Sequence, residues 1–225
     1  TLDIGDNCDE HDKDITLSIR YAVDNGAKVI NMSFYKEMSM YEAWVLEAIK
    51  YASDHDVLIV SIAGNDGLDL NKNLKYPNDR LRDGSEVSDN FILAGASNYM
   101  LGKDFRLDYS NYGSTDVDLF APGDYIYTTA PFNEYDSESN GTSSAGAITS
   151  GVAALIRSYY PDLTASQVKH ILMDSGIEYT LEVSTPTEED PDKTTPFNQL
   201  SKSGKVLNAY NALLMAERIS KGKRQ

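Results

Sequence analysis

A serine that follows Gly-Thr, in a turn before an apolar helical pattern, is the first residue of this sequence that suggests chemistry. Residues 140–145 (NGTSSA) place Ser143 in the first turn of the helix that the next residues predict. The positive end of the helix macrodipole favours a nucleophilic hydroxyl at that point. The structural alternative is helix capping, because Ser and Thr are preferred at helix starts for reasons unrelated to catalysis.

An asparagine in a glycine-rich turn is the second such residue. Asn65 lies in residues 61–67 (SIAGNDG), at the end of an apolar strand pattern. In α/β folds the carboxyl ends of strands build ligand sites, and a side-chain amide there can stabilise an oxyanion. The alternative is again structural, because Gly-Asn-Asp-Gly is also ordinary turn sequence. The two residues indicate a function only when they are taken together.

Helices that alternate with short apolar strands are expected to position these residues. Helical periodicity covers residues 14–25 and 41–52, and Gly26 is a natural stop for the first helix. Buried strands are predicted at residues 28–34 (KVINMSF), 57–62 (VLIVSI) and 91–96 (FILAGA). This alternation indicates right-handed βαβ crossovers. It therefore predicts an α/β fold of three layers, a parallel sheet with helices on both faces.

The second half of the chain adds further elements and one acidic loop. Elements are predicted at residues 116–130 (strand, broken at Pro122-Gly123), 142–159 (helix, closed by Pro161), 164–173 (helix with a capping box) and 205–218 (helix). Polar residues 133–140 lead into the long helix, and residues 178–203 predict an acidic, mobile surface loop. No repeat or domain boundary is evident, so residues 1–225 are expected to form one unit.

Four motifs in fixed order carry a family resemblance. They are VINMSF, SIAGNDG, DLFAPGDYIYTT and NGTSSAGAITSGVAALI, and the later YYPDLTASQVKHIL and GKVLNAYNAL agree with them. The sequence resembles the C-terminal two-thirds of a subtilisin-like serine protease (subtilase) domain, over about residues 14–216. The N-terminal strands of that domain are not recognisable here. The resemblance implies a subtilisin-like α/β fold and hydrolysis of peptide bonds.

The resemblance also implies roles for individual residues. Ser143 would be the nucleophile, and Asn65 would donate to the oxyanion together with the backbone N–H of Ser143. Two walls would bind an extended substrate by β-strand addition. The substrate-binding residues would be Ser33 and Phe34 on one wall and Ile62, Ala63 and Gly64 on the opposite wall of the primary specificity pocket.

The general-base half of such a site is not found in this sequence. The family's triad Asp and its His-Gly-Thr-His motif lie upstream of the matching region, and neither occurs here. The histidines present are His11, His55 and His170, each expected on the solvated surface. Without a base a serine hydroxyl stays protonated near neutral pH, so the chain alone is expected to be inactive. Truncation of a longer protease explains the missing Asp and His better than evolutionary loss of activity does. An enzyme that had lost its activity would have no chemical need to keep both Ser143 and Asn65.

Two local departures from the family pattern concern the same site. Tyr35 stands where the family usually has Gly after the substrate-flanking pair, so its ring is expected to narrow the pocket. In the nucleophile helix Ser144, Gly146 and Ala147 replace the usual Met, small residue and Pro. Loss of that Pro and the presence of Gly146 predict a looser first turn.

Two functions from different classes therefore stay open. The first is a serine endopeptidase acting through a Ser143 acyl-enzyme, with the base supplied from outside this chain. The second is a catalytically inactive peptide-binding or scaffold protein on the same fold. A lipase or esterase is disfavoured, because the sequence has no Gly-x-Ser-x-Gly elbow.

Charge, cysteine count and hydropathy exclude other classes. The net charge of −15 disfavours nucleic-acid and anionic-membrane partners, and no apolar run approaches a membrane span. The single Cys8 rules out an internal disulfide and a thiolate metal site. The sequence fixes no compartment, whereas the resemblance implies a secreted or periplasmic parent protein.

The remaining expectations from the sequence concern metal binding and self-association. The acidic residues Asp6, Asp9, Asp12 and Asp14 lack the Gly and Glu of an EF-hand and are expected in a solvated loop. No cofactor is predicted. The family often binds calcium elsewhere, but no matching ligands can be identified. If early strands are missing, an unpaired sheet edge at VINMSF predicts self-association.

Overall fold

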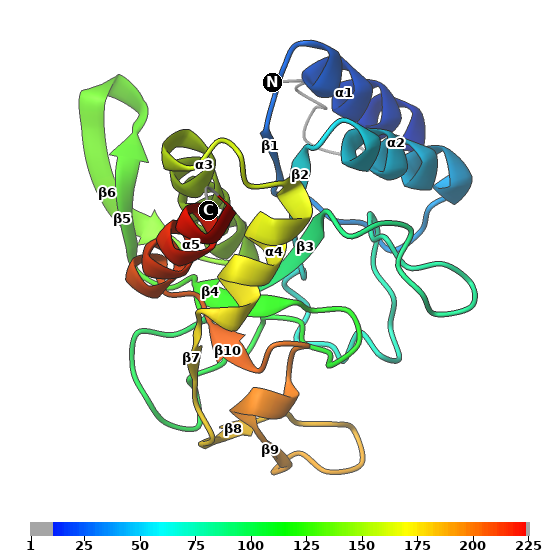
Figure 1. Cartoon of the computed structure of the whole chain (residues 1–225). Helices are drawn as coiled ribbons and strands as arrows, with labels where there is room; N and C mark the ends of the chain where they lie inside the picture. The colour runs from blue at the N-terminus through cyan, green and yellow to red at the C-terminus, as the bar shows by residue number, and fades with distance from the viewer. Residues whose placement is uncertain (1–10, 224–225) are drawn as a thin grey trace.

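A six-stranded sheet forms the centre of the protein (Figure 1). The computed structural model describes residues 11–223. In spatial order the strands are β1 (Val29–Met32), β2 (Leu58–Ile62), β3 (Phe91–Ser97), β4 (Leu119–Pro122), β10 (Lys205–Val206) and β7 (Ile177–Glu178). The neighbours from β1 to β10 run parallel, and β7 alone runs antiparallel to its neighbour. The predicted parallel sheet is confirmed.

Helices cover both faces of this sheet (Figure 1). They are α1 (Asp12–Asp24) and α2 (Glu42–Asp54) on one face, and α3 (Thr142–Tyr159), α4 (Ala165–Asp174) and α5 (Ala209–Lys223) on the other. Successive residues of β2 show why both faces need cover: Ile59 packs with α1 and α2, whereas Leu58 and Val60 pack with α3 to α5. All residues of β2 are buried, as expected for an apolar strand between two helix layers. The three-layer α/β architecture is confirmed.

The last helix starts later than the sequence predicts. Residues 205–206 form β10, in which Val206 pairs with Phe120 of β4 and Ile177 of β7, and α5 begins only at Ala209. Val206 is buried because the sheet continues through it. A two-residue strand is too short to show a period of its own. The predicted helix over 205–218 is therefore wrong in its first turn.

Two hairpins place strands in the polar residues 133–140 and in the acidic segment 178–203, where the sequence predicts none, and the first hairpin also uses the strand predicted within residues 116–130. Strands β5 (Ile126–Ala130) and β6 (Glu134–Ser139) pair through a short 3-10 turn (Pro131–Asn133) and project from the body next to α3 (Figure 1). Within the acidic segment 178–203, β8 (Glu182–Ser184) pairs with β9 (Thr194–Pro196), and a 3-10 turn (Phe197–Gln199) follows. The side chains of Val183 and Phe197 are buried in the same hydrophobic cluster that α1 and α2 join. This segment is anchored at those apolar positions.

The end strand of the sheet has the position expected from the sequence. Within residues 11–223, β1 pairs with β2 and has no strand on its other side. Self-association through this edge stays a prediction. None of the helices in the same range combines the length and hydropathy that a bilayer crossing requires.

A buried cluster of charged side chains lies between β4, α4 and the loops before β3. The Asp118 carboxylate is buried, accepts a hydrogen bond from the Leu93 N–H at 2.7 Å and lies 3.0 Å from Lys202 Nζ. Glu86 bonds Lys169 at 2.7 Å and also pairs with Lys202. Asp79 is buried beside these groups. Burial, with the charges of Asp118 and Glu86 added, raises the pKa of Asp79 to about 7.

The raised pKa of Asp79 predicts a pH-dependent stability. A carboxyl whose pKa rises from 3.8 to about 7 on folding stabilises the protein below pH 4, and this contribution is lost as the pH rises from about 4 through 7. Asp79→Asn should therefore raise the free energy of unfolding at pH 8, relative to pH 5, by up to about 3 kcal/mol compared with wild type, since about two pH units of the loss lie above pH 5. Urea unfolding at both pH values measures this.

The control is Asp83→Asn, because Asp83 is exposed and its hydrogen bonds from Ser85 lower its pKa. That variant should follow the wild-type pH dependence between pH 5 and pH 8. An Asp79→Asn variant that also follows it would contradict the prediction.

Candidate active site

Asn65 lies three residues past the end of β2 and is held by the start of α3. Its side-chain oxygen accepts two hydrogen bonds from Thr142, one from the backbone N–H at 3.0 Å and one from the hydroxyl at 2.8 Å. Within residues 11–223 no partner is recorded for Asn65 Nδ2, and the side chain is exposed. The carboxamide is thus fixed by its oxygen, and its N–H donors are left available beside the first turn of α3.

Ser143 is the second residue of α3 and is half-buried. Its Oγ lies 3.5 Å from the carbonyl oxygen of Ser33, and Ser33 Oγ lies 3.5 Å from the carbonyl oxygen of Ser143. Both contacts are at the outer limit of hydrogen-bond length, so neither locks the hydroxyl. The helix is preceded by Gly141, which provides no side-chain cap. In the described chain the Ser143 N–H has no recorded acceptor, as is usual in a first helical turn.

The structure brings three of the predicted site residues together. Ser33 follows the carboxyl end of β1 and Asn65 follows that of the adjacent β2. At the start of α3, Ser143 contacts Ser33 and its neighbour Thr142 bonds Asn65. Because the strands are parallel and adjacent, their ends reach the same edge of the sheet. A hydroxyl, a carboxamide and an open helix N-terminus converge there.

The other predicted residues form the base of this edge. Phe34 is half-buried and packs against the core, and Ile62 and Ala63 are buried in the sheet. Only the backbone of Ile62 and Ala63 is therefore suited to face a ligand. Gly64 has φ of +97°, a conformation that L side chains rarely adopt. The sharp turn at Gly64 carries the chain from the sheet to Asn65.

The three histidines lie elsewhere. His170 on α4 bonds Asp89 at 3.0 Å, and His55 at the end of α2 contacts the Tyr51 carbonyl at 2.8 Å. His11 precedes α1, and all three are exposed, which confirms their predicted surface position. Within residues 11–223 no histidine is recorded as a partner of Ser143.

The acidic run near the start behaves differently from its prediction as a solvated loop. Asp12 opens α1, is buried, and pairs with Lys36 at 2.6 Å while accepting from the Tyr41 N–H. Asp14 also lies in α1, whereas Asp6 and Asp9 fall outside the described residues. For Asp12 the prediction is wrong, because a long-range lysine satisfies its charge. Among the side chains that the structure describes, no cluster of three is suited to a metal ion.

Tyr35 joins the two sides of the site. Its ring lies against Gly64, where an added Cβ would be 3.0 Å from two ring carbons. Its hydroxyl donates to Asp66 Oδ1 at 3.2 Å, and Lys75 Nζ lies 3.1 Å from Asp66 Oδ2. Burial would raise the pKa of Asp66, but the hydrogen bonds from Lys75 and Asn111 outweigh it and hold the pKa below its ordinary value. Asp66 is therefore a stable anion that ties Tyr35 to the loop.

Sequence reasoning missed Thr142 and Asn111. Thr142 orients Asn65, and the buried Asn111 bonds the loop around Asn65. No local signal identifies Asn111, because its partners lie more than 40 residues away. Thr142 stood within the helix-start motif, where its type suggested only capping.

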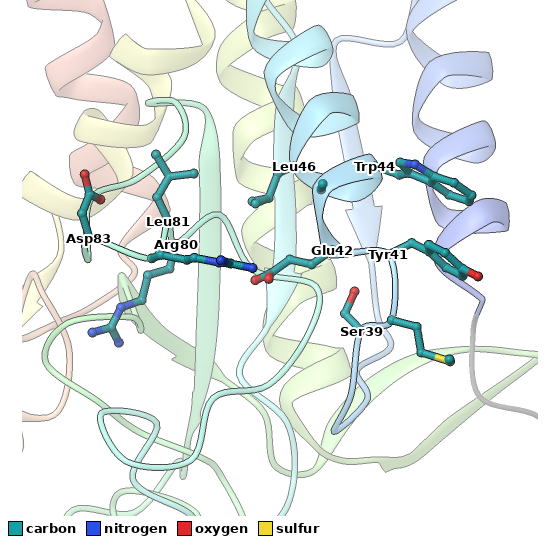
Figure 2. Close-up of a pocket in the computed structure, with 11 residues that line it drawn as sticks. Ser39, Tyr41, Glu42, Trp44, Leu46, Arg80, Leu81 and Asp83 are labelled. Atoms are coloured by element: carbon teal, nitrogen blue, oxygen red, sulfur yellow. The ribbon is translucent and has the colours of Figure 1, made fainter.

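A separate pocket opens where α2 begins (Figure 2). Its volume is about 750 Å³, and its lining includes Tyr41, Glu42, Trp44, Leu46, Arg80 and Leu81. The rings of Tyr41 and Trp44 stack with centroids 4.4 Å apart and are exposed. None of the predicted site residues lines this pocket, so it is distinct from the convergence at Ser143.

The comparison with protein families shows to which family the chain belongs. The model of the Subtilase family matches residues 1–206. The chain belongs to the subtilase family. Among curated proteins, this subtilase is 35% identical to Subtilisin DY of Bacillus licheniformis over 163 residues, which is 72% of the chain and 54% of that protein. It is 35% identical to Thermitase of Thermoactinomyces vulgaris over 144 residues, 64% of the chain and 45% of that protein.

A solved structure of the subtilase cytotoxin SubAB assembly shares the fold. Its TM-score to this subtilase is 0.73 at 24% identity, covering 95% of this chain and 68% of that one. The resemblance predicted from the four motifs is confirmed. The chain spans about half the length of the two curated relatives.

Gly146 explains how α3 reaches the site in this subtilase. A Cβ at Gly146 would lie 2.7 Å from Ile62 Cγ2 and 3.6 Å from Asn31 Oδ1, so the helix touches β2 there without a side chain. The sequence predicted that Gly146 loosens the first turn, whereas the structure gives it a packing role. The close contact brings Ser143 to the end of β2.

Gly146→Ala should therefore destabilise the protein, because the new methyl group must displace Ile62 or the helix. We expect a loss of about 1–3 kcal/mol in the free energy of unfolding, measured with urea. Gly151→Ala on the same helix is the matched control, since nothing lies within 4 Å of its added Cβ. That change should stabilise by about 0.4–1 kcal/mol. Equal effects of both variants would contradict the close-contact account.

Proposed function

We propose that this chain supplies the nucleophile and oxyanion half of a serine endopeptidase site, with Ser143 attacking the carbonyl carbon of a peptide bond. The observation that carries the proposal is the pair of hydrogen bonds from Thr142 to Asn65 Oδ1. They hold the Asn65 oxygen on Thr142, and the proposal is that the Asn65 N–H donors then serve the adjacent Ser143. A preorganised donor of this kind stabilises negative charge where it develops.

The steps follow from the geometry of these groups. Attack by Ser143 Oγ converts the carbonyl oxygen to an oxyanion, which Asn65 Nδ2 and the Ser143 N–H would receive. Collapse of the intermediate releases the amine, which takes up the proton that the Ser143 hydroxyl lost to the base, and leaves an acyl-Ser143, which water then hydrolyses. The hydroxyl proton needs an acceptor. Since no histidine in residues 11–223 bonds Ser143, the proposal assigns the base to residues of the complete protein outside that range.

The substrate is proposed to be an extended polypeptide. The backbone of Ser33 and Phe34 continues the free side of β1, where a peptide can add as a strand. Gly64 and the backbone of Ile62 and Ala63 face it from the end of β2. The Tyr35 ring against Gly64 restricts the room between these two segments, which is the narrowing that the sequence predicts.

Covalent labelling tests the nucleophile directly. In the complete protein a fluorophosphonate probe should modify Ser143, because the probe mimics a carbonyl under attack and leaves its oxygen in the oxyanion site. Ser143→Ala should abolish labelling. Ser144→Ala is the matched control, since the adjacent hydroxyl bonds Ser139 at 2.9 Å instead, and it should keep labelling. A folded protein that binds peptides but shows no labelling would instead support an inactive peptide-binding protein.

Substitution of the oxyanion donor gives a quantitative test. Asn65→Ala should lower kcat for a peptide substrate about 100- to 1,000-fold and change KM by less than about threefold, because the donor acts mainly on the transition state. Asn73→Ala is the control, because Asn73 is exposed in the same long loop and bonds only the Asp69 carbonyl there. A similar kcat loss in both variants would count against the role of Asn65.

A further inference from the structure

We propose that Asn111 is a positioning residue of the oxyanion site, holding residues 63–68 in the shape that presents Asn65 beside Ser143. The inference rests on the proposed function, since it concerns the same donor. Asn111 touches neither Asn65 nor Ser143 through its side chain in the recorded hydrogen bonds of residues 11–223. Asn111 therefore acts through residues 63–68, the loop that carries Asn65.

The contacts of Asn111 surround Asn65 on both sides in sequence. Its Nδ2 donates to the Ala63 carbonyl at 2.8 Å, and its Oδ1 accepts from the Asp66 and Leu68 N–H groups at 3.2 and 2.7 Å. Its own N–H donates to the Gly64 carbonyl at 3.0 Å. One side chain therefore fixes the backbone before and after the residue that carries the donor.

Only a residue with both a donor and an acceptor at this reach can make these contacts. The carboxamide of Asn provides both, whereas a carboxylate or an alkyl group does not. Asn111 is fully buried, so removal of its side chain would leave loop N–H and C=O groups without partners. A Cβ at Gly64 would lie 2.7 Å from Asn111 Nδ2. The absence of a side chain at Gly64 thus leaves room for the Asn111 carboxamide against the loop.

Asn111 is itself fixed by a buried arginine. Arg106 donates to the carbonyls of Leu107, Asp108 and Ser110, at 2.9, 2.9 and 2.5 Å. Its guanidinium also donates to the Ser184 carbonyl at 2.9 Å, and Gly67 N–H donates to the Tyr109 carbonyl at 2.7 Å. These hydrogen bonds hold the turn before Asn111 in place. The Asn111 side chain therefore reaches residues 63–68 from a fixed backbone position.

A second connection keeps the loop attached when Asn111 is changed. Tyr35 and Lys75 both bond the Asp66 carboxylate independently of Asn111. Loss of Asn111 should consequently loosen the loop around Asn65 without detaching it. The expected result is a misplaced donor in a folded protein, which lowers kcat more than it raises KM.

A double-mutant cycle in the complete protein tests the inference. Asn111→Ala should lower kcat for a chromogenic peptide about 10- to 100-fold, with KM changed by less than about threefold. Because Asn111 acts through Asn65, the double variant Asn65→Ala/Asn111→Ala should match Asn65→Ala alone within about twofold. Independent, multiplying losses of kcat would overturn the inference, as would an unchanged kcat in Asn111→Ala.

The matched control is Asn90→Ala at the amino end of β3. Asn90 is also buried and donates to the Val57 carbonyl at 2.7 Å, far along the strands from the site. It should lower the melting temperature as Asn111→Ala does but leave kcat within about twofold. An equal kcat loss in Asn90→Ala would show that general destabilisation causes the effect and would overturn the inference.

Asn111→Asp covers the case in which the alanine variant does not fold. It keeps the acceptor, loses the Nδ2 donor and regains a donor when the carboxyl is protonated. Its kcat relative to wild type should rise as the pH falls, and a constant ratio would overturn the inference. Turnover that survives Ser143→Ala would instead reject the proposed function, so the two failures are distinguishable.

Discussion

Two hydrogen bonds from Thr142 to the side-chain oxygen of Asn65 join the end of β2 to the start of α3. They require the helix to begin within reach of the sheet edge, and Gly146 permits this by letting α3 contact Ile62 without a side chain between them. They also require Asn65 to turn out of the strand, which Gly64 allows at φ of +97°. The proposed chemistry depends on this one junction.

Polar residues from distant segments stabilise the junction. Asn111 bonds the loop directly, and Tyr35 with Lys75 bonds it through Asp66. Each of these groups has hydrogen-bond partners within the protein, so the loop is held in one arrangement before any ligand arrives. Preorganisation of this kind is what an oxyanion donor needs, because a mobile carboxamide would lose its advantage over water.

The sequence predicted the helices and strands better than the contacts between distant segments. Strand patterns such as VLIVSI follow from burial on both faces, and they placed Asn65 at the carboxyl edge of the sheet, whereas Ser33 came from the family resemblance. The helix predicted over 205–218 began too early, because Val206 pairs with β4 and β7 as part of the sheet. The acidic segment 178–203 suggested a mobile loop by composition, yet Phe197 anchors it among core aromatics. Asn111, Tyr35 and Asp66 depend on contacts between distant segments, which no local pattern encodes.

The most direct test of the junction is a crystal structure of the complete protein with a phosphonate attached to Ser143. The account predicts that a phosphonyl oxygen lies within about 2.7–3.1 Å of Asn65 Nδ2 and of the Ser143 N–H, with Asn65 Oδ1 still bonded to Thr142. An adduct whose oxygen points to solvent, or an Asn65 side chain rotated away from it, would contradict the central claim.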